Sequence, residues 1–193
     1  MDLELAGRHV LLTGGSKGIG LACARGFLQE GARVSLVARN EQTLAAAALS
    51  LADARPDAEQ LVATYACDLG DPQAAVELVE GVEQDQGPVD ILVNSAGAAR
   101  RSPPDELDSA KWHAAMQAKY FTYIHVMDPL VKRMAARGAG VIVNVVGAGG
   151  KVDPTALLVA LDAPGLSPRR GHGDPRFASL EPDIARLRVR SRF

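Results

Sequence analysis

The sequence predicts an α/β fold, a three-layer αβα sandwich built on a mostly parallel sheet of about five strands. Short apolar runs rich in branched residues alternate with helix-like segments, as in parallel sheets with crossover connections. The runs are nearly continuous in apolar character, which is typical of strands covered on both faces. A glycine-rich turn joins the first run to the first helix-like segment, as in phosphate-binding strand-turn-helix units.

Five runs are expected to form the strands. They are residues 9–13, 33–38, 61–67, 89–94 and 141–146. Open parallel sheets bind ligands at the carboxyl ends of their strands, so functional side chains are expected directly after these runs.

Four segments between the runs are expected to be helical. They are about residues 19–30, 41–52, 73–86 and 108–137. Asn40 suits the N-cap of the second helix, and Asp71 with Pro72 suits the start of the third. Gly31 suits a left-handed end to the first helix. Pro129 is expected to kink the last helix or to break it in two.

The turn after the first strand reads Thr-Gly-Gly-Ser-Lys-Gly-Ile-Gly over residues 13–20. Gly14 allows a tight turn, Gly18 lets backbone N–H groups approach a pyrophosphate, and Gly20 lets the helix pack directly on the strand. The first turn of the helix offers free N–H groups and a partial positive charge. The alternative is a strand-to-helix turn that binds nothing.

Composition limits the class of protein. A chain of 193 residues is expected to form one domain. Its 21 basic and 23 acidic residues give a net charge of -2, so no nucleic-acid partner is expected. Cys23 and Cys67 lack metal-ligand spacing, which predicts free thiols and no metal site. The sequence contains no long apolar run, so we expect a cytoplasmic protein without a signal peptide or membrane contact.

Several motifs together resemble those of a known family. The glycines are spaced G-x-x-x-G-x-G after Thr13, Asp68 follows the third predicted strand, and residues 94–97 read Asn-Ser-Ala-Gly after the fourth. In order and spacing these motifs resemble the cofactor site of the short-chain dehydrogenase/reductases, over about residues 7–150. The resemblance implies a Rossmann-like NAD(P)-binding domain over residues 1–150.

The resemblance implies a set of cofactor-binding residues. They are Thr13, Gly14, Ser16, Lys17, Gly18, Ile19, Gly20, Arg39, Asn40, Asp68, Leu69, Asn94, Ala96, Gly97 and Val145. Within this set, Asp68 would accept a hydrogen bond from the adenine amino group and Leu69 would line the ring, while Asn94 would tie neighbouring strands together. The alternative for Asp68 is a turn residue ahead of the Asp71 cap.

Two basic residues favour NADP(H) over NAD(H). Arg39 follows the second strand, where an NAD-specific protein usually carries an acidic residue for the ribose 2′-hydroxyl. An arginine there meets a 2′-phosphate instead, and Lys17 adds a second positive charge on the same side. The alternative is that both are solvated surface charges.

The catalytic residues of the family are not found. The resemblance implies hydride transfer between the nicotinamide and an alcohol or carbonyl, carried out by a tyrosine, a lysine four residues later, a serine and an asparagine. Gly147 stands in the serine position and Lys119 in the asparagine position. No tyrosine follows Tyr123 and no lysine follows Lys151. Impaired or absent chemistry is therefore expected.

Lys119 is the candidate catalytic residue, because a lysine near the nicotinamide can hold a water or the cofactor ribose. The alternative is a lysine whose stem lies along the helix with its ammonium in solvent. At helical spacing around it lie four large side chains that we expect to pack in the core. They are Trp112, Met116, Tyr120 and Tyr123.

Residues 151–193 differ from the rest of the chain. They hold five of the eleven prolines and eight basic against five acidic residues, without apolar periodicity. We expect a poorly ordered tail, and our hypothesis is a truncation followed by an out-of-frame or heavily diverged segment. The alternative is a basic tail that binds an acidic partner. A sheet left incomplete at its C-terminal edge would expose apolar surface and be marginally stable or aggregation-prone.

Two functions remain open. The first is an NADP(H)-dependent oxidoreductase that acts on a small alcohol or carbonyl substrate. The second is a nucleotide-binding protein without turnover, a pseudoenzyme or fragment. Relatives in the family often pair through the helix around Lys119 and the helix after Gly150. The second of these helices is not found in the sequence, so the resemblance leaves a monomer and a homo-oligomer as alternatives.

Overall fold

The computed structural model describes residues 3–97 and 104–146. They contain a five-stranded sheet in the order β3-β2-β1-β4-β5, in which every neighbouring pair is parallel. The strands are β1 (His9–Thr13), β2 (Arg33–Ala38), β3 (Val62–Ala66), β4 (Ile91–Asn94) and β5 (Val141–Asn144). The predicted tail over residues 151–193 lies outside the described residues.

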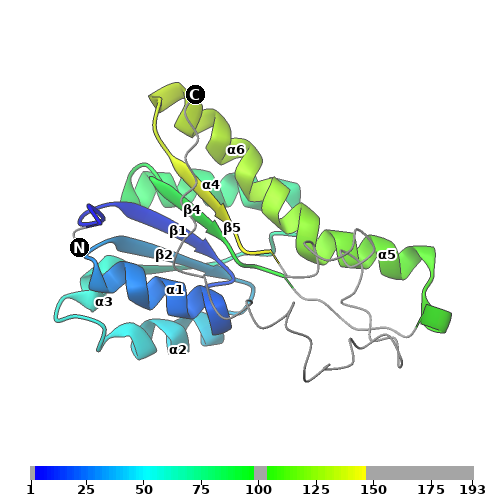
Figure 1. Ribbon diagram of the computed structural model, residues 1–193, viewed down its shortest axis with the longest axis horizontal. Coiled ribbons are helices and arrows are strands. Elements are labelled where there is room, and N and C mark those ends of the chain that lie inside the picture. Colours follow the sequence, from blue (N-terminus) through cyan, green and yellow to red (C-terminus); the bar gives the residue numbers. More distant parts are fainter. Residues whose placement is uncertain (1–2, 98–103, 147–193) are drawn as a thin grey trace, which may run out of the picture.

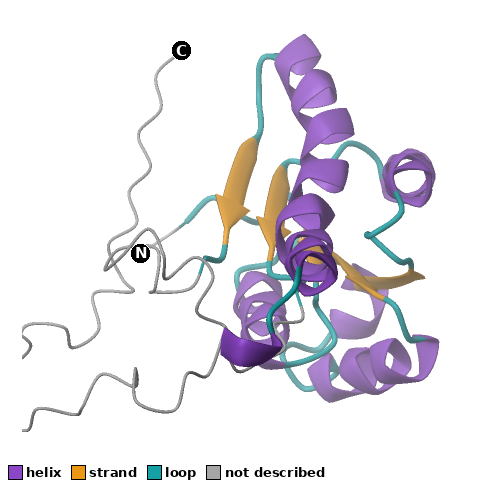
Figure 2. Ribbon diagram, turned by 90° about the vertical axis from the view of Figure 1, so that its right-hand side faces the viewer, coloured by secondary structure: helices purple, strands orange, loops and turns teal. Residues whose placement is uncertain are grey.

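Helices cover the sheet on both sides. They are α1 (Gly18–Gln29), α2 (Glu41–Leu51), α3 (Ala58–Leu61), α4 (Pro72–Gln86), the 3-10 turn η1 (Pro104–Glu106), α5 (Ser109–Met116), the π-helical segment η2 (Gln117–Phe121) and α6 (Thr122–Arg137). Apolar residues of α1 and α2 pack on one face of the sheet and those of α4 and α6 on the other, as Figures 1 and 2 show. The predicted three-layer α/β fold is confirmed.

The core follows from the alternation of side chains along the central strand. β1 is buried over its whole length. Val10 and Leu12 point into the cluster under α1 and α2, whereas Leu11 points into the cluster under α4 and α6. Successive residues of a strand face opposite sides, so an uninterrupted apolar strand serves two cores at once.

The predicted helix ends are present. The Asn40 side chain accepts a hydrogen bond from Thr43 N at 2.9 Å and so caps α2. The Asp71 carboxylate accepts one from Gln73 N at 2.8 Å, directly before Pro72 at the first position of α4. Gly31 follows α1 with a φ of 84°, the left-handed conformation expected there.

Some predicted bounds are wrong. β3 begins at Val62 because Leu61 ends the short helix α3, which the sequence analysis did not predict. β4 begins at Ile91 instead of Val89, and β5 ends at Asn144 instead of residue 146. The fourth run extends past β4 because Val89 is buried in the core cluster under α4 and α6 without being in a strand. Burial does not explain the end of the fifth run, because Val146 is 73% exposed.

Of the two effects expected of Pro129, a kink or a break in the last helix, the break is absent. α6 continues through Pro129, which is buried inside this sixteen-residue helix. A proline removes one intrahelical hydrogen bond, and the packing of α6 on the sheet outweighs that loss. The helix is interrupted earlier, at η2, where the Thr122 hydroxyl donates to the carbonyl of Lys119 at 3.0 Å. π-helical segments of this kind are frequent at functional sites.

The expected core stripe around Lys119 is only partly correct. Tyr123 is buried and Trp112 is half-buried, but Met116 and Tyr120 are 38% and 51% exposed. α5 extends beyond the sheet (Figure 1), and none of its residues is buried. Helical spacing showed that these four side chains lie on one face of the helical segment. It did not show which part of that face packs against the sheet.

The expectation of strands covered on both faces fails at β5. Val141 and Val143 are 52% and 39% exposed, although their register partners Ile91 and Val93 in β4 are buried. β5 is the edge strand of the described sheet. The predicted incomplete edge is therefore present in the part of the chain described.

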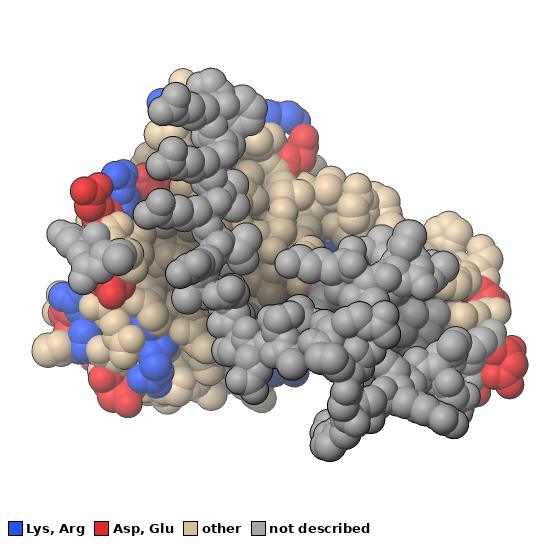
Figure 3. All heavy atoms as spheres, in the orientation of Figure 1, with Lys and Arg blue, Asp and Glu red and all other residues tan. Residues whose placement is uncertain are grey.

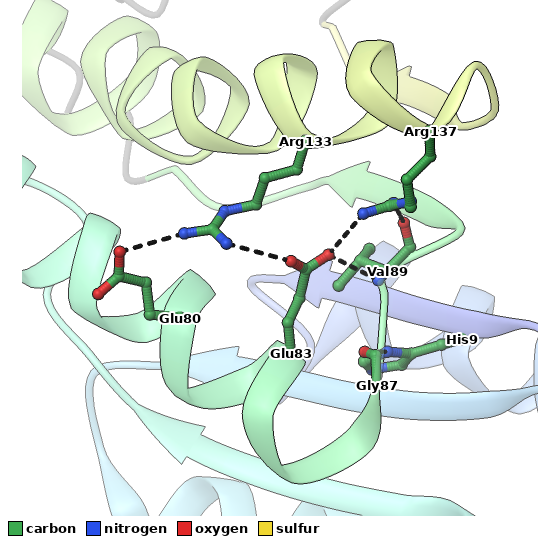
Figure 4. A network of polar contacts seen from close by, with 7 residues as sticks. All are labelled: His9, Glu80, Glu83, Gly87, Val89, Arg133 and Arg137. Carbon is green, nitrogen blue, oxygen red and sulfur yellow. Dashed lines mark hydrogen bonds and ion pairs between the residues drawn. The ribbon is translucent and has the colours of Figure 1, made fainter.

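A group of ion pairs joins α4 to α6 (Figure 4). Glu83, whose side chain is 13% exposed, lies 3.2 Å from Arg137 and 3.5 Å from Arg133. The same carboxylate accepts a hydrogen bond from Val89 N at 2.9 Å, and Arg137 donates to Val89 O at 2.7 Å. Arg133 also pairs with Glu80 at 3.1 Å. These contacts hold the segment before β4, at Val89, to both α4 and α6.

His9 connects the sheet to the end of α4. Its side chain is fully buried; Nδ1 lies 2.8 Å from the carbonyl of Gly87 and Nε2 lies 2.9 Å from the Ser35 hydroxyl. In the neutral ring Nδ1 donates to the carbonyl and Nε2 accepts from the hydroxyl. Burial, with a smaller contribution from the charge of Arg33, lowers the pKa of His9 below its usual value.

We expect this burial to make folding stability depend on pH. Because the folded pKa of His9 is lowered, the unfolded chain binds the proton first as pH falls below about 6.5. The stabilisation is complete above that pH and is lost toward lower pH, with a slope of at most about 1.4 kcal/mol per pH unit. Melting temperatures of the wild-type chain and His9→Gln between pH 8 and 5 test this. The expected result is a steeper fall for wild type, with the exposed His113→Gln change as control; equal slopes would contradict it.

The charge is mixed on the part of the described surface that Figure 3 shows. On the face drawn in Figure 3, acidic and basic side chains lie among one another and form no large patch of one sign. Within residues 3–97 and 104–146, no helix combines the length and hydropathy needed to cross a bilayer.

Candidate cofactor site

A cleft of about 700 Å³ opens at the carboxyl ends of the strands. β1 has β2 on one side and β4 on the other, although the chain reaches β4 only after β3. The connection after β1 leads to one side of it, and the connection after β3 leads to the other side. The strand order therefore reverses between β1 and β4, and open α/β sheets bind ligands at such a point. The glycine turn, the ends of β2, β3 and β4, and the segment from α5 to α6 line the cleft.

The glycine turn has the geometry that its sequence predicts. Gly14 has a φ of 69°, and a Cβ there would lie 2.7 Å from Ala96 N. A Cβ on Gly20 would overlap the carbonyl oxygen of Gly14. Gly18 has a φ of 56°, and a Cβ there would have no other atom within 4 Å. Gly14 and Gly20 thus allow close contacts between backbone segments that a side chain would prevent. Gly18 leaves its backbone accessible.

Polar side chains join the carboxyl ends of three strands. Thr13, Asn94 and Asn144 are register partners across β1, β4 and β5. The Thr13 hydroxyl donates to Asn94 Oδ1 at 3.2 Å and accepts from Ala96 N at 3.3 Å. Asn94 Nδ2 donates to Asn144 Oδ1 at 2.9 Å. Asn94 ties neighbouring strands together as the sequence analysis expected.

The loop after β3 forms one wall. Cys67, Asp68, Leu69 and Gly70 line the cleft. One carboxylate oxygen of Asp68 accepts a hydrogen bond from Gly70 N at 3.0 Å, so Asp68 is a turn residue and also faces the cleft. Burial and the nearby Asp68 charge raise the pKa of the Cys67 thiol, so this cysteine, like Cys23 a free thiol, is held in its protonated, unreactive form.

Lys17 and Arg39 line the same cleft from the glycine turn and from the end of β2. Both side chains are exposed, and neither forms a hydrogen bond or ion pair within the described residues. Arg39 also borders a smaller hollow of about 330 Å³ beside the start of α2. Ile19 is 61% exposed at the edge of the cleft. One cleft is thus lined by an exposed apolar side chain and by two cations that have no partner among the described residues, which fits a bound group with both apolar and anionic parts.

One wall of the cleft carries none of the predicted site residues. This wall consists of residues from α5, η2 and α6, which are Ala114, Gln117, Ala118 and Thr122. The small residues Ala114 and Ala118 are four apart and therefore lie on one helical face. That spacing was a usable signal, but alanine occurs throughout the chain and the pattern was not distinctive.

The predicted site residues divide into two groups. Those that line the cleft are Gly14, Ser16, Lys17, Ile19, Arg39, Asn40, Asp68, Leu69, Ala96 and Gly97. The others do not line it, and they are Thr13, Gly18, Gly20, Asn94, Lys119 and Val145. The backbone of Val145 instead donates to Asn94 O at 2.8 Å, which aligns the chain after β5 with β4.

Lys119 lies behind Gly97 and not in solvent. Its Nζ lies 2.9 Å from Tyr123 Oη and 3.4 Å from Val145 O, and 4.9 Å from the centre of the Tyr123 ring. Tyr123 Oη in turn donates to Val145 O at 2.8 Å. A Cβ on Gly97 would lie 2.6 Å from Lys119 Cδ, so the lysine needs a glycine at that position. Gly147, in the family's serine position, lies outside the described residues.

The short chain dehydrogenase family profile matches residues 8–159. Gluconate 5-dehydrogenase of Gluconobacter oxydans is 37% identical over 143 residues, which cover 74% of this chain and 54% of that protein. The crystal structure of L-sorbose reductase from Gluconobacter frateurii, complexed with NADPH and L-sorbose, is 32% identical with a TM-score of 0.73, over 83% of this chain and 61% of that one.

An NAD+-bound xylitol dehydrogenase structure is 25% identical with a TM-score of 0.72, over 81% of this chain and 60% of that one. The chain spans about half the length of the curated relatives it matches. The profile covers most of the chain and runs from β1 to beyond β5, through the glycine turn and every wall of the cleft. The chain belongs to the short chain dehydrogenase family.

Proposed function

We propose that this chain is an NADP(H)-dependent oxidoreductase that transfers hydride between the cofactor and an alcohol or carbonyl. The observation that carries the proposal is a cleft at the β1/β4 switch point in which two cations, Lys17 and Arg39, have no protein partner among the described residues. A dinucleotide with an additional phosphate supplies the anions that such a site lacks.

The residues of the cleft suit the parts of such a cofactor. The first N–H groups of α1 have no acceptor inside the helix, and Gly18 leaves room above them for a pyrophosphate. We assign the adenine to the loop after β3, between Asp68 and Leu69. Gly97 and Ala96 would lie along the nicotinamide ribose.

The preference for NADP(H) rests on the position of Arg39. Its guanidinium follows β2, and the smaller hollow beside it adjoins the start of α2. An arginine pairs with phosphate through two parallel hydrogen bonds, whereas a ribose hydroxyl offers no charge to pair with. Known structures of relatives include complexes with NADPH and with NAD+, so the family alone does not select one cofactor.

The nicotinamide would supply the hydride, and the chain must supply a proton donor or acceptor. Lys119 is our candidate for that end of the cleft, because its ammonium lies against Gly97 and forms two hydrogen bonds within residues 3–97 and 104–146. An ammonium has three donors. The third is available for a water or a cofactor hydroxyl.

We expect Lys119→Ala to lose turnover by at least about a hundredfold, the lower range for a lost acid or base, while NADPH affinity stays within about twofold. Lys119→Met, which keeps the aliphatic stem against Gly97, serves as the packing control and should lose turnover equally. Steady-state rates and fluorescence titration of the same preparations measure both. Unchanged rates would remove Lys119 from the chemistry.

The second candidate is a nucleotide-binding protein without turnover. It is favoured by residues 147–193, which contain no tyrosine and only one lysine, Lys151. Under this proposal the cleft binds the same cofactor, and the chain lacks the group that moves the proton. The two candidates agree on binding and differ only on rate.

The first experiment is titration of the purified chain with NADPH and NADH, following the fluorescence of Trp112, the only tryptophan. Micromolar NADPH binding with much weaker NADH binding is the expected result, and no binding of either would overturn the proposal. A panel of gluconate, L-sorbose and xylitol then tests turnover, because relatives carry these substrates in their names. Residues 1–150 as the binding domain, a homo-oligomer and a cytoplasmic location remain predictions.

A further inference from the structure

His125 contacts the wall of the cleft from behind. It lies in the first turns of α6, half-buried, and its Nδ1 is 2.9 Å from the carbonyl oxygen of Leu69. A carbonyl only accepts, so Nδ1 carries the proton and donates. Leu69 itself is 4% exposed and lines the cleft. The bond therefore reaches a residue that forms the binding surface.

The Leu69 side chain packs in the core cluster under α4 and α6, and backbone and capping hydrogen bonds hold the loop that carries it at both ends. At its start, Cys67 N donates to Ala38 O at 3.0 Å. At its end, Asp71 caps α4, and Asp71 N donates back to Asp68 O at 3.1 Å. Among the described residues, His125 is the one side chain from α6 that hydrogen-bonds to this loop. It supports the loop at the middle of its span.

The imidazole is itself attached to the opposite wall. Its ring packs on Phe121, with centroids 5.8 Å apart and planes tilted by 31°. Phe121 ends the π-helical segment η2, and Thr122, the next residue, lines the cleft. His125 thus joins the helical wall of the cleft to the wall formed by the loop after β3.

We propose that His125 is a positioning residue that sets the spacing between these two walls and so controls the binding of the adenine end of the cofactor. The inference rests on the proposed function, because it assigns adenine to the space between Asp68 and Leu69. A loop already held in its binding position loses less conformational freedom when the base binds. The free carboxylate oxygen of Asp68 is carried by the same loop and is oriented with it.

The test is the affinity of the full chain for 2′,5′-ADP, which carries the adenine and both ribose phosphates without the nicotinamide. We expect His125→Leu to weaken binding by about threefold to tenfold, the effect of one lost hydrogen bond. His125→Asn should restore it, because the asparagine Nδ2 is as many bonds from the backbone as the histidine Nδ1. His125→Gln places its amide one bond further and should not.

Two controls separate positioning from stability. His113→Leu removes an exposed histidine of α5 that bonds only to Ser109, and should leave 2′,5′-ADP affinity unchanged. Melting temperatures of all variants show whether affinity changes follow a general loss of stability. Affinity that recovers in His125→Asn but not in His125→Gln, at similar melting temperatures, is the expected pattern.

Other outcomes overturn the inference. Equal affinity of wild type and His125→Leu would show that the bond does not matter for binding. Equal weakening in the leucine and asparagine variants, or unfolding of all three His125 variants, would show a role in the fold alone. If the wild-type chain binds neither NADPH nor 2′,5′-ADP, the proposed function fails and this inference fails with it.

Discussion

Replacing Arg39 by alanine is expected to weaken NADPH binding by about tenfold to a hundredfold and to leave NADH binding within about twofold. A hydrogen bond to a charged group contributes about 1.5–3 kcal/mol, which corresponds to this range. Arg39 has no intramolecular partner among the described residues, so the substitution breaks no contact of the fold there. Fluorescence titration with both cofactors measures the two affinities.

Two further variants make the result specific. Arg39→Asp should reverse the preference, because a carboxylate at this position repels a 2′-phosphate and accepts from a ribose 2′-hydroxyl. Arg25→Ala removes an arginine of α1 that pairs with Asp53 instead of lining the cleft, and should change neither affinity. Equal losses of NADPH and NADH affinity in Arg39→Ala would mean that Arg39 does not contact the 2′-phosphate.

Gly20→Ala is expected to destabilise the fold by about 3 kcal/mol, at the upper end of the usual cost of overpacking. The added Cβ would overlap the carbonyl of Gly14, and a backbone atom in a closed turn cannot rotate away as a side chain can. The turn must open, which displaces the N-terminus of α1 from the strand. We therefore also expect binding of both NADPH and NADH to be lost, as measured by titration alongside urea denaturation.

The same helix provides the matched control. Gly26→Ala adds the same methyl group where nothing lies within 4 Å of it. Alanine is a better helix former than glycine, so this variant should gain about 0.5–1 kcal/mol and keep its cofactor affinity. A Gly20→Ala chain as stable as wild type would show that the turn is not closed as described.

Both expectations depend on features that could be predicted from local sequence. The glycine turn, the Asn40 and Asp71 caps and the central strands each follow from a few adjacent residues, because turn geometry, capping and strand burial are short-range properties. The order of Thr13, Asp68 and Asn94 along the chain was enough to place them at the carboxyl ends of parallel strands. The same motifs carry the resemblance to the short chain dehydrogenase family.

Other features required the packing of distant segments. Pro129 lies within a continuous α6, because tertiary packing outweighs one lost backbone hydrogen bond. Tyr120 is exposed and Tyr123 is buried, although both lie on the helical stripe around Lys119. Neither outcome is encoded in helical spacing, which does not indicate where the sheet ends.

By itself, the sequence determined the fold class, the glycine turn and the strand ends at which the cleft lies, because these depend on residues that are neighbours in the chain. Only the tertiary structure showed that Lys119 is held by Tyr123 and the carbonyl of Val145, and that His125 supports Leu69. The partners in these contacts come from different elements, and the His125 contact joins positions 56 residues apart. Such contacts are decided by how α6 packs across the strands, which no local pattern specifies.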